Sequence, residues 1–262
     1  MHINDLQNIG AALLQELSLL KNSHLLKSPQ GKGAGGDTTY YIDRRAEEII
    51  IARLQDLRKP LTVISEEAGL VHLHGGGEIV LVDPIDGSRN AVAGLPFYGT
   101  SLAVAEGSTV GDVRCAYVLN LVSGDAFWAE KNQGTFSLGK RMHCQEGEKF
   151  SVIAYEAPVP MSDLTPLAPL LAAALKTRCM GATALDLAYL ACGAISVFAT
   201  AAPSRSFDFA GGCLLIKEAG GIVTDLQGND LDGCELGIRK STTLLAAGNA
   251  DLHTKALSLL HA

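Results

Sequence analysis

The spacing of apolar residues changes along the chain and predicts two structural units. Residues 5–20 carry apolar side chains at intervals of three and four, which predicts an amphipathic helix. A polar, glycine-rich loop is expected at 27–38, followed by a second helix over 43–58. The next apolar runs predict consecutive strands with short turns, a pattern typical of an antiparallel sheet. These strands are expected near residues 61–65, 78–82, 99–106, 112–119 and 124–130.

Beyond residue 150 predicted strands alternate with helices, which indicates an α/β arrangement. The strands are expected at 151–155, 194–200, 221–225 and 243–247, and the helices at 163–176, 183–192, 208–219 and 249–260. The stretch at 131–149 has no clear pattern and is taken as the boundary. We therefore predict an N-terminal α+β domain, residues 1–138, and a C-terminal α/β domain, residues 139–262.

Two aspartates stand where one predicted strand ends. Asp83 and Asp86 follow the apolar run at 79–82 and enclose a proline, which cannot extend the hydrogen-bond ladder. Both carboxylates can then turn toward one point, where a hard cation such as Mg²⁺ would find oxygen ligands. The next residues, Gly87 and Ser88, offer backbone N–H groups to a phosphate. The motif predicts a metal-assisted phosphate site.

Further carboxylates stand at the ends of other predicted elements. Glu66 and Glu67 follow the strand at 61–65. Asp43 and Asp208 stand at predicted helix starts, where a carboxylate is favoured. Each of them alone is an ordinary surface or capping residue, but the set indicates one acidic site.

In their order and spacing these segments resemble the inositol monophosphatase family of lithium-sensitive, Mg²⁺-dependent phosphatases. The resemblance implies a layered α-β-α-β-α sandwich of the sugar-phosphatase type, and a homodimer. The matching segments are Gly36 to Asp43, Ser65-Glu66-Glu67, Asp83-Pro84-Ile85-Asp86-Gly87-Ser88, Gly181-Ala182-Thr183-Ala184, and Phe207-Asp208 with the following Ala-Gly-Gly.

The resemblance also implies a ligand set for the metal. Glu66, Asp83 and the Ile85 carbonyl would bind one ion, and Asp83 would bridge to a second ion held with Asp86 and Asp208. Two to three Mg²⁺ ions per site are expected, with Mn²⁺ as a substitute.

Catalytic and substrate-binding roles follow from the same resemblance. Asp43 and Ser88, with Glu66, would orient the attacking water. Lys32 and Asp37 would belong to a mobile loop over the site. The residues expected to bind substrate are Asp86, Gly87, Ser88, Gly181, Ala182, Thr183 and Arg205.

One departure from the family pattern concerns the substrate. Animal inositol monophosphatases have a glutamate seven residues before the last metal aspartate, where it holds inositol hydroxyls, and this chain has Ala201. We therefore expect hydrolysis of both inositol 1-phosphate and fructose 1,6-bisphosphate. An adenosine 3′,5′-bisphosphate phosphatase is the alternative, and so is a non-catalytic regulatory protein that keeps the fold. The complete carboxylate set favours an enzyme.

Composition narrows the remaining function classes. A formal net charge of −7 argues against general nucleic-acid binding. The six cysteines form no Cys-x-x-Cys pair, which argues against a zinc site and favours a reducing, cytoplasmic location. No uncharged apolar run is long enough to span a membrane, and the first residues lack the basic region of a signal peptide.

Overall fold

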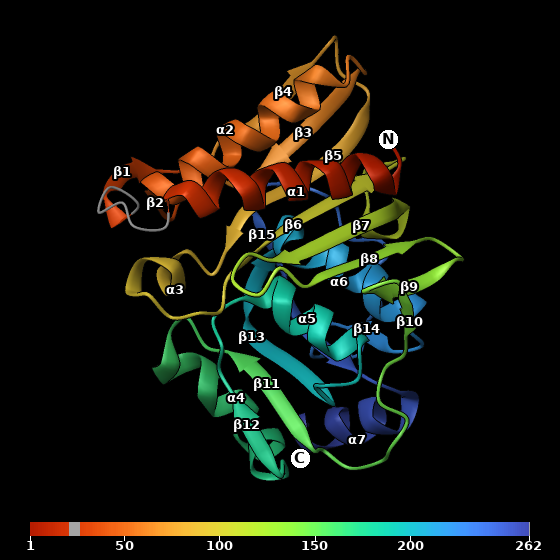
Figure 1. Ribbon diagram of the computed structural model, residues 1–262. Coiled ribbons are helices and arrows are strands. Elements are labelled where there is room, and N and C mark those ends of the chain that lie inside the picture. Colours follow the sequence, from red (N-terminus) through yellow and green to blue (C-terminus); the bar gives the residue numbers. More distant parts are fainter. Residues whose placement is uncertain (21–26, 262) are drawn as a thin grey trace.

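The computed structural model describes residues 1–20 and 27–261, in which two large sheets and three pairs of helices form alternating layers (Figure 1). One helix pair covers the outer face of the larger sheet, one lies between the sheets, and one covers the smaller sheet. The layered sandwich implied by the family resemblance is confirmed. The pairs are α1 (Ile3–Leu20) with α2 (Tyr41–Asp56), α5 (Thr183–Ala191) with α6 (Ser206–Glu218), and α4 (Pro160–Ala172) with α7 (Ala250–Leu260).

The larger sheet has eight strands in the order β10-β9-β8-β7-β6-β5-β3-β4. All neighbours are antiparallel except β3 and β5, which run parallel. The expected antiparallel pairing therefore fails at this one pair. The strands are β3 (Leu61–Ser65), β4 (Gly69–Leu73), β5 (Glu78–Asp86), β6 (Gly99–Ala105), β7 (Val113–Asn120), β8 (Ala126–Glu130), β9 (Gly134–Ser137) and β10 (Lys140–Met142).

The sequence pattern missed β4, β9 and β10, which are short and lie toward the edges of this sheet. In β4 only Gly69 and Leu73 are buried, so too few apolar positions mark it as a strand. The chain leaves β4 through residues 74–77 and returns as β5 on the far side of β3. This detour is what makes β3 and β5 parallel.

The smaller sheet has five strands in the order β12-β11-β13-β15-β14. Its first three strands are parallel, which fits the expected α/β arrangement although β12 was not predicted, while β15 runs antiparallel to both of its neighbours. Helix α4 begins earlier than expected because Pro160 fits the first helical turn. The strands are β11 (Val152–Glu156), β12 (Lys176–Arg178), β13 (Val197–Arg205), β14 (Ile222–Thr224) and β15 (Lys240–Ala247).

The segment expected to be a loop at 27–38 contains a strand of a small hairpin. β1 (Pro29–Lys32) pairs antiparallel with β2 (Thr38–Tyr40). Every residue of β1 is exposed, so no alternation of apolar side chains could reveal it. Between the strands, the Ala34 N–H donates to the Glu67 carbonyl at 3.0 Å and the Gly35 N–H to the Glu66 carbonyl at 2.8 Å. The hairpin end thus rests on the chain that follows β3.

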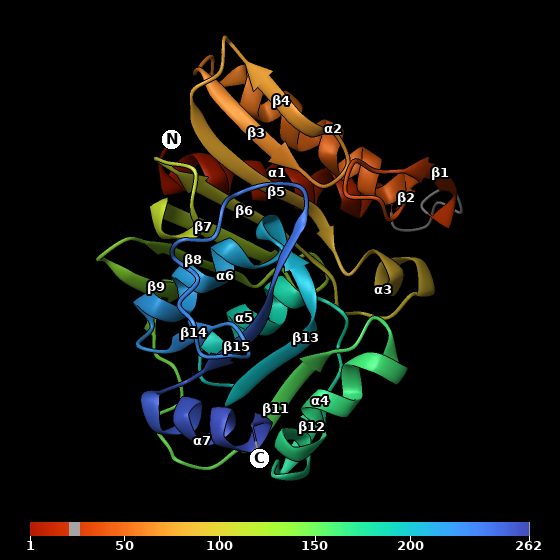
Figure 2. The same ribbon diagram turned by 180° about the vertical axis from the view of Figure 1, so that it is seen from behind.

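Helices α5 and α6 lie between the two sheets, as the view from behind also shows (Figure 2). They share one buried core with both sheets, in which Leu81 and Ala116 come from the larger sheet and Phe198 and Leu244 from the smaller. Strand β10 lies beyond residue 138 and still pairs with β9. The division into two domains at residues 138 and 139 stays a prediction. No helix in the described part of the chain is long and apolar enough to cross a membrane.

Two adjacent glycines in α6 test how closely this middle layer is packed. A Cβ at Gly212 would lie 2.5 Å from Leu187 Cδ1 in α5, whereas a Cβ at Gly211 would lie 3.4 Å from Ser101 Oγ, an ordinary contact. We expect Gly212→Ala to lower the free energy of unfolding by about 1–2 kcal/mol, since overpacking outweighs the better helix propensity. Gly211→Ala should be neutral or stabilising by up to about 1 kcal/mol. Urea denaturation measures both, and equal effects would contradict this packing.

Candidate active site

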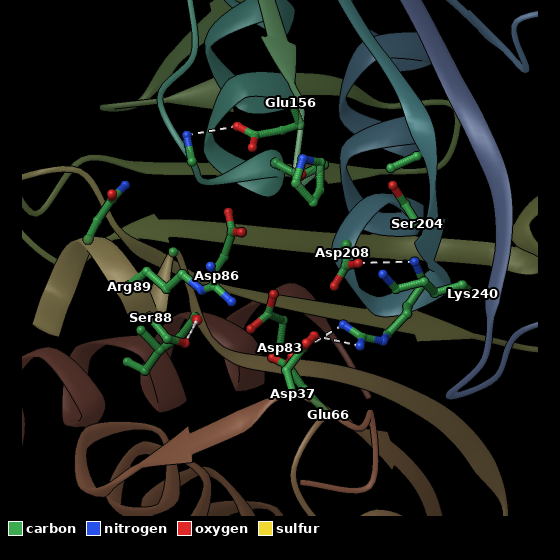
Figure 3. Close-up of a pocket in the computed structure, with 18 of the residues that line it drawn as sticks. Asp37, Glu66, Asp83, Asp86, Ser88, Arg89, Glu156, Ser204, Asp208 and Lys240 are labelled. Atoms are coloured by element: carbon green, nitrogen blue, oxygen red, sulfur yellow. Dashed lines mark hydrogen bonds and ion pairs between the residues drawn. The ribbon is translucent and has the colours of Figure 1, made fainter. Parts of the chain in front are cut away.

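A cavity of about 410 Å³ opens where β5, β13 and the first turns of α3 (Ser88–Ala93), α5 and α6 meet (Figure 3). Carboxylates outnumber basic side chains on its wall, so the cavity strongly attracts cations. The seven carboxylates are Asp37, Glu66, Glu67, Asp83, Asp86, Glu156 and Asp208, and the three basic residues are Arg89, Arg205 and Lys240.

The motif after the apolar run forms the floor of this cavity. β5 continues past the predicted end at residue 82, but its pairing with β6 is irregular between Asp83 and Asp86. Gly87 then turns the chain with a φ of 86°, a left-handed conformation that suits glycine, into α3 (Ser88–Ala93). A Cβ at Gly87 would also lie 3.0 Å from the Gly181 carbonyl. The glycine allows α3 to start close to the segment that precedes α5.

The parallel pairing of β3 and β5 places a second carboxylate beside the first. Ser65 is opposite Val82 in the register, and the Glu66 N–H donates to the Val82 carbonyl at 3.3 Å. Glu66 therefore leaves its strand level with Asp83. Of the two neighbouring glutamates, Glu67 turns toward the hairpin, where it accepts a hydrogen bond from the Thr39 hydroxyl.

Four neighbouring carboxylates of the cavity wall have raised pKa values. Burial, Glu66 and Asp86 raise the pKa of Asp83 well above its usual value. Burial and Asp208 do the same to the pKa values of Glu66 and Asp86, and burial raises that of Asp208 to about 6. Asp83 is 2% exposed, and its Oδ1 has no hydrogen-bond partner among the described residues. A buried anionic oxygen without a donor is costly, and a cation would relieve that cost.

The carboxylate cluster suits a divalent cation by the type of its donor atoms, although these atoms are not already arranged as a coordination shell. In residues 1–20 and 27–261 no three His, Cys, Asp or Glu side chains already enclose a common point as ion ligands would. Carboxylate oxygens are nevertheless the donors that Mg²⁺ prefers, and Asp83 Oδ1 is free to accept such an ion.

Asp43 both caps a helix and keeps one oxygen free. It is the third residue of α2, and its Oδ2 accepts the Tyr40 N–H at 2.7 Å. Its buried Oδ1 has no partner in the described chain. Burial raises the pKa of Asp43 to about 6, against the effects of the Tyr40 N–H and the nearby Ser88 hydroxyl. Ser88 itself donates to the Ile85 carbonyl at 2.9 Å.

The start of α5 reaches the cavity, but its N–H groups are already used. The Gly181 N–H donates to Glu156 at 2.7 Å, and the Ala184 N–H donates to Asp86 at 2.8 Å. Gly181 and Thr183 line the cavity, whereas Ala182 is buried and does not. The expected substrate-binding segment is therefore in place, with its first donors committed to carboxylates.

Sequence reasoning missed the pair formed by Glu156 and Asp186. Asp186 is fully buried, and burial together with Glu156 raises its pKa well above the usual value. Neither carboxylate oxygen of Asp186 has a hydrogen-bond partner among the described residues. The two residues lie 30 positions apart on a strand and a helix, and no local motif signals the pair.

Arg205 was expected to bind substrate, but its charge is already engaged. Its Nη2 lies 2.6 Å from both Asp37 Oδ2 and the Gly35 carbonyl, and its Nη1 lies 3.5 Å from Glu66 Oε1. The side chain is 8% exposed. Arg205 thus ties the hairpin end to the cavity wall. Lys32 is exposed on β1 and does not line the cavity, whereas Asp37 does.

Ala201, expected at the position where relatives hold inositol hydroxyls, does not itself line the cavity. Ala201 packs against the core beneath the smaller sheet, while Thr200 and Ala202 line the cavity. Pro203 and Ser204 complete this part of the wall, so β13 still presents no carboxylate to a substrate before Asp208. Arg89 and Lys240 also line the cavity, although no sequence motif marked them as site residues.

The pKa shifts predict how pH affects the metal-free protein. The pKa values of Asp43 and Asp208 are about 6 and that of Glu67 is about 7, all above their unfolded values. The stability that these groups contribute is present below about pH 4 and is lost as pH rises toward about pH 7. We expect the Tm in EDTA to fall between about pH 5 and about pH 7, and less steeply in Asp43→Asn. A Tm that rises over this interval, or an equal slope in the variant, would contradict the shifts.

Comparison with known proteins agrees with the fold and the motifs. The model of the inositol monophosphatase family matches residues 3–262. A fructose-1,6-bisphosphatase/inositol-1-monophosphatase of Methanothermobacter thermautotrophicus is 35% identical over 239 residues, which cover 87% of this chain and 85% of the relative. An inositol-1-monophosphatase of Mesorhizobium japonicum is 30% identical over 227 residues, 84% of this chain and 82% of the relative.

A solved structure agrees over nearly the whole chain. The extragenic suppressor protein suhB from Bartonella henselae superimposes with a TM-score of 0.84 at 26% identity, covering 98% of this chain and 97% of that protein. The match of the family model over the full described fold decides the assignment. The chain belongs to the inositol monophosphatase family.

Proposed function

We propose that the protein is a Mg²⁺-dependent phosphomonoesterase that acts on small polyol or sugar phosphates. The observation that carries the proposal is a group of four carboxylates, from the ends of β3 and β5 and the first turn of α6, around one open cavity. The names of relatives supply the first substrates to test, inositol 1-phosphate and fructose 1,6-bisphosphate. A homodimer and a cytoplasmic location stay predictions.

The carboxylates divide into two proposed ligand groups. Glu66, Asp83 and the Ile85 carbonyl would hold one ion, and Asp83 would share a second with Asp86 and Asp208. Two or three Mg²⁺ bound there would neutralise charge on the phosphoryl group and lower the pKa of a bound water.

The chain's own residues would orient the water and the phosphate. Asp43 is ionised at neutral pH because its pKa is about 6, so its free Oδ1 can accept a proton from the attacking water. Ser88 would hold that water through its hydroxyl oxygen, whose own proton is donated to the Ile85 carbonyl. Backbone N–H groups of Gly87 and Ser88 would bind phosphate oxygens.

The leaving group would lie against the start of α5. Gly181 and Thr183 form that part of the cavity wall, and Asp86 is fixed there by the Ala184 N–H. Ala182 would shape this wall from behind, and Arg205 would act by holding the hairpin end rather than by touching substrate.

Other substrates remain alternatives to be tested with the same enzyme. A bifunctional NADP phosphatase/NAD kinase of Methanococcus maripaludis is 28% identical over 254 residues. NADP and an adenosine bisphosphate both carry a phosphate group on the ribose of an adenosine, so this relative is the reason to test adenosine 3′,5′-bisphosphate. A protein named Nus factor SuhB of Pseudomonas aeruginosa, 30% identical over 199 residues, is the reason to keep a regulatory role as an alternative. Phosphate release across a substrate panel with Mg²⁺ separates these candidates, and no release from any of them would overturn the proposal.

Asp83→Asn tests the bridging position. Loss of a shared ligand should lower kcat roughly 10³-fold or more while the fold is retained. Phosphate release and circular dichroism measure both properties. Asp56→Asn, at an exposed carboxylate at the end of α2, is the matched control and should keep full activity. An Asp83→Asn enzyme that keeps more than about a tenth of the rate would contradict the bridge.

The hairpin end tests the proposed mobile loop. We expect Asp37→Ala to raise the Mg²⁺ concentration for half-maximal rate several-fold, because Asp37 lines the cavity and anchors Arg205. Lys32→Ala should have a smaller effect, since Lys32 is exposed outside the cavity. Mg²⁺ titrations at saturating substrate measure both variants, and superimposable curves would mean that the loop is passive.

A further inference from the structure

Arg89 presents an uncommitted positive charge at the cavity rim. It follows Ser88 in the first turn of α3, is exposed, and lines the cavity. Its side chain extends from α3 toward the cavity beside Asp86 (Figure 3). No carboxylate of the described residues lies within ion-pair distance of its guanidinium, although seven carboxylates line the same cavity.

The other two basic residues of the cavity are placed differently. Arg205 is buried and engaged by Asp37, the Gly35 carbonyl and Glu66. Lys240, at the start of β15, is on the opposite side of the cavity from Arg89, where its charge lowers the pKa of Asp208 (Figure 3). Arg89 is therefore the cation that faces the proposed leaving-group side.

The backbone that carries Arg89 is fixed next to that side. The Asn90 side chain donates to the Met180 carbonyl at 2.6 Å and to the Phe97 carbonyl at 2.7 Å. These bonds hold the first turn of α3 against the segment that leads into Gly181. A guanidinium on a fixed backbone loses less freedom when it binds an anion.

The other residues of the cavity wall on this side do not provide a partner for the positive charge of Arg89. Glu156, a further carboxylate of the wall, already accepts the Gly181 N–H. Apart from Arg205, which is already engaged, the residues of β13 that line the cavity are neutral. An uncharged polyol would leave Arg89 without an anionic partner, whereas a second phosphate would meet the planar pair of donors that guanidinium groups present.

We propose that Arg89 binds a second phosphate group on the leaving-group part of the substrate and selects bisphosphorylated sugars over monophosphates. The inference rests on the proposed phosphatase function and names its substrate class. It assigns Arg89 to binding and not to the chemical step.

Paired substrates test this selectivity. Fructose 1,6-bisphosphate is compared with fructose 1-phosphate and fructose 6-phosphate at saturating Mg²⁺. Arg89→Ala should lower kcat/KM for the bisphosphate about 10- to 100-fold, mainly through KM, and change that of the monophosphates less than about threefold. Arg89→Lys should keep part of the preference, because it retains charge without the planar pair of donors. Arg141→Ala, at an exposed arginine of β10 outside the cavity, is the control and should change neither.

Binding without turnover provides a second measurement. In an Asp43→Asn background, calorimetry with Mg²⁺ and fructose 1,6-bisphosphate should show about 10- to 100-fold weaker binding when Arg89→Ala is added. Equal losses on mono- and bisphosphates, or unchanged bisphosphate binding, would overturn the role of Arg89 and leave the phosphatase function standing. A wild-type enzyme that releases no phosphate from any substrate would instead overturn the proposed function itself.

Discussion

The concentration of negative charge in a buried place is the constraint on which the site depends. Glu66, Asp83, Asp86 and Asp208 come from the ends of β3 and β5 and from the first turn of α6, and Glu66, Asp86 and Asp208 each raise the pKa of at least one other. The apolar cores of the adjoining layers hold these groups together against their repulsion. The energy stored in that repulsion becomes affinity for cations, because an ion removes the repulsion when it binds.

Much of the fold could be predicted because strong apolar periodicity marks its central elements. Helices α1, α2, α5, α6 and α7 and the long strands β5, β6 and β7 lie within a few residues of their expected places. The elements that were missed, such as β1, β4 and β10, are exposed or lie at edges, so pairing with a neighbour rather than burial defines them. Strand order also escaped prediction, since local patterns carry no information on which strands become neighbours.

The residues of the candidate site also fall into those that local motifs could predict and those that depend on tertiary contacts. Asp83, Asp86, Glu66 and Asp208 could be found because each stands at an element end within a recognisable motif, and the structure brings them to one cavity. Arg205 could not be placed, because its partners Asp37 and Glu66 lie more than 130 residues away in sequence. The Glu156–Asp186 pair depends on the contact of a strand with a helix, which only the folded chain defines.

Strand β4 contributes no residue to the cavity, yet the site exists because of it. If β4 did not lie between them along the chain, β3 and β5 would be joined by a tight turn and would pair antiparallel. Glu66 would then emerge at the opposite end of the sheet from Asp83, roughly 16 Å away for a five-residue strand. The edge strand β4 can therefore vary in sequence and remain solvent-exposed. Its deletion, however, would place Glu66 and Asp83 at opposite ends of the sheet and so remove the shared acidic site.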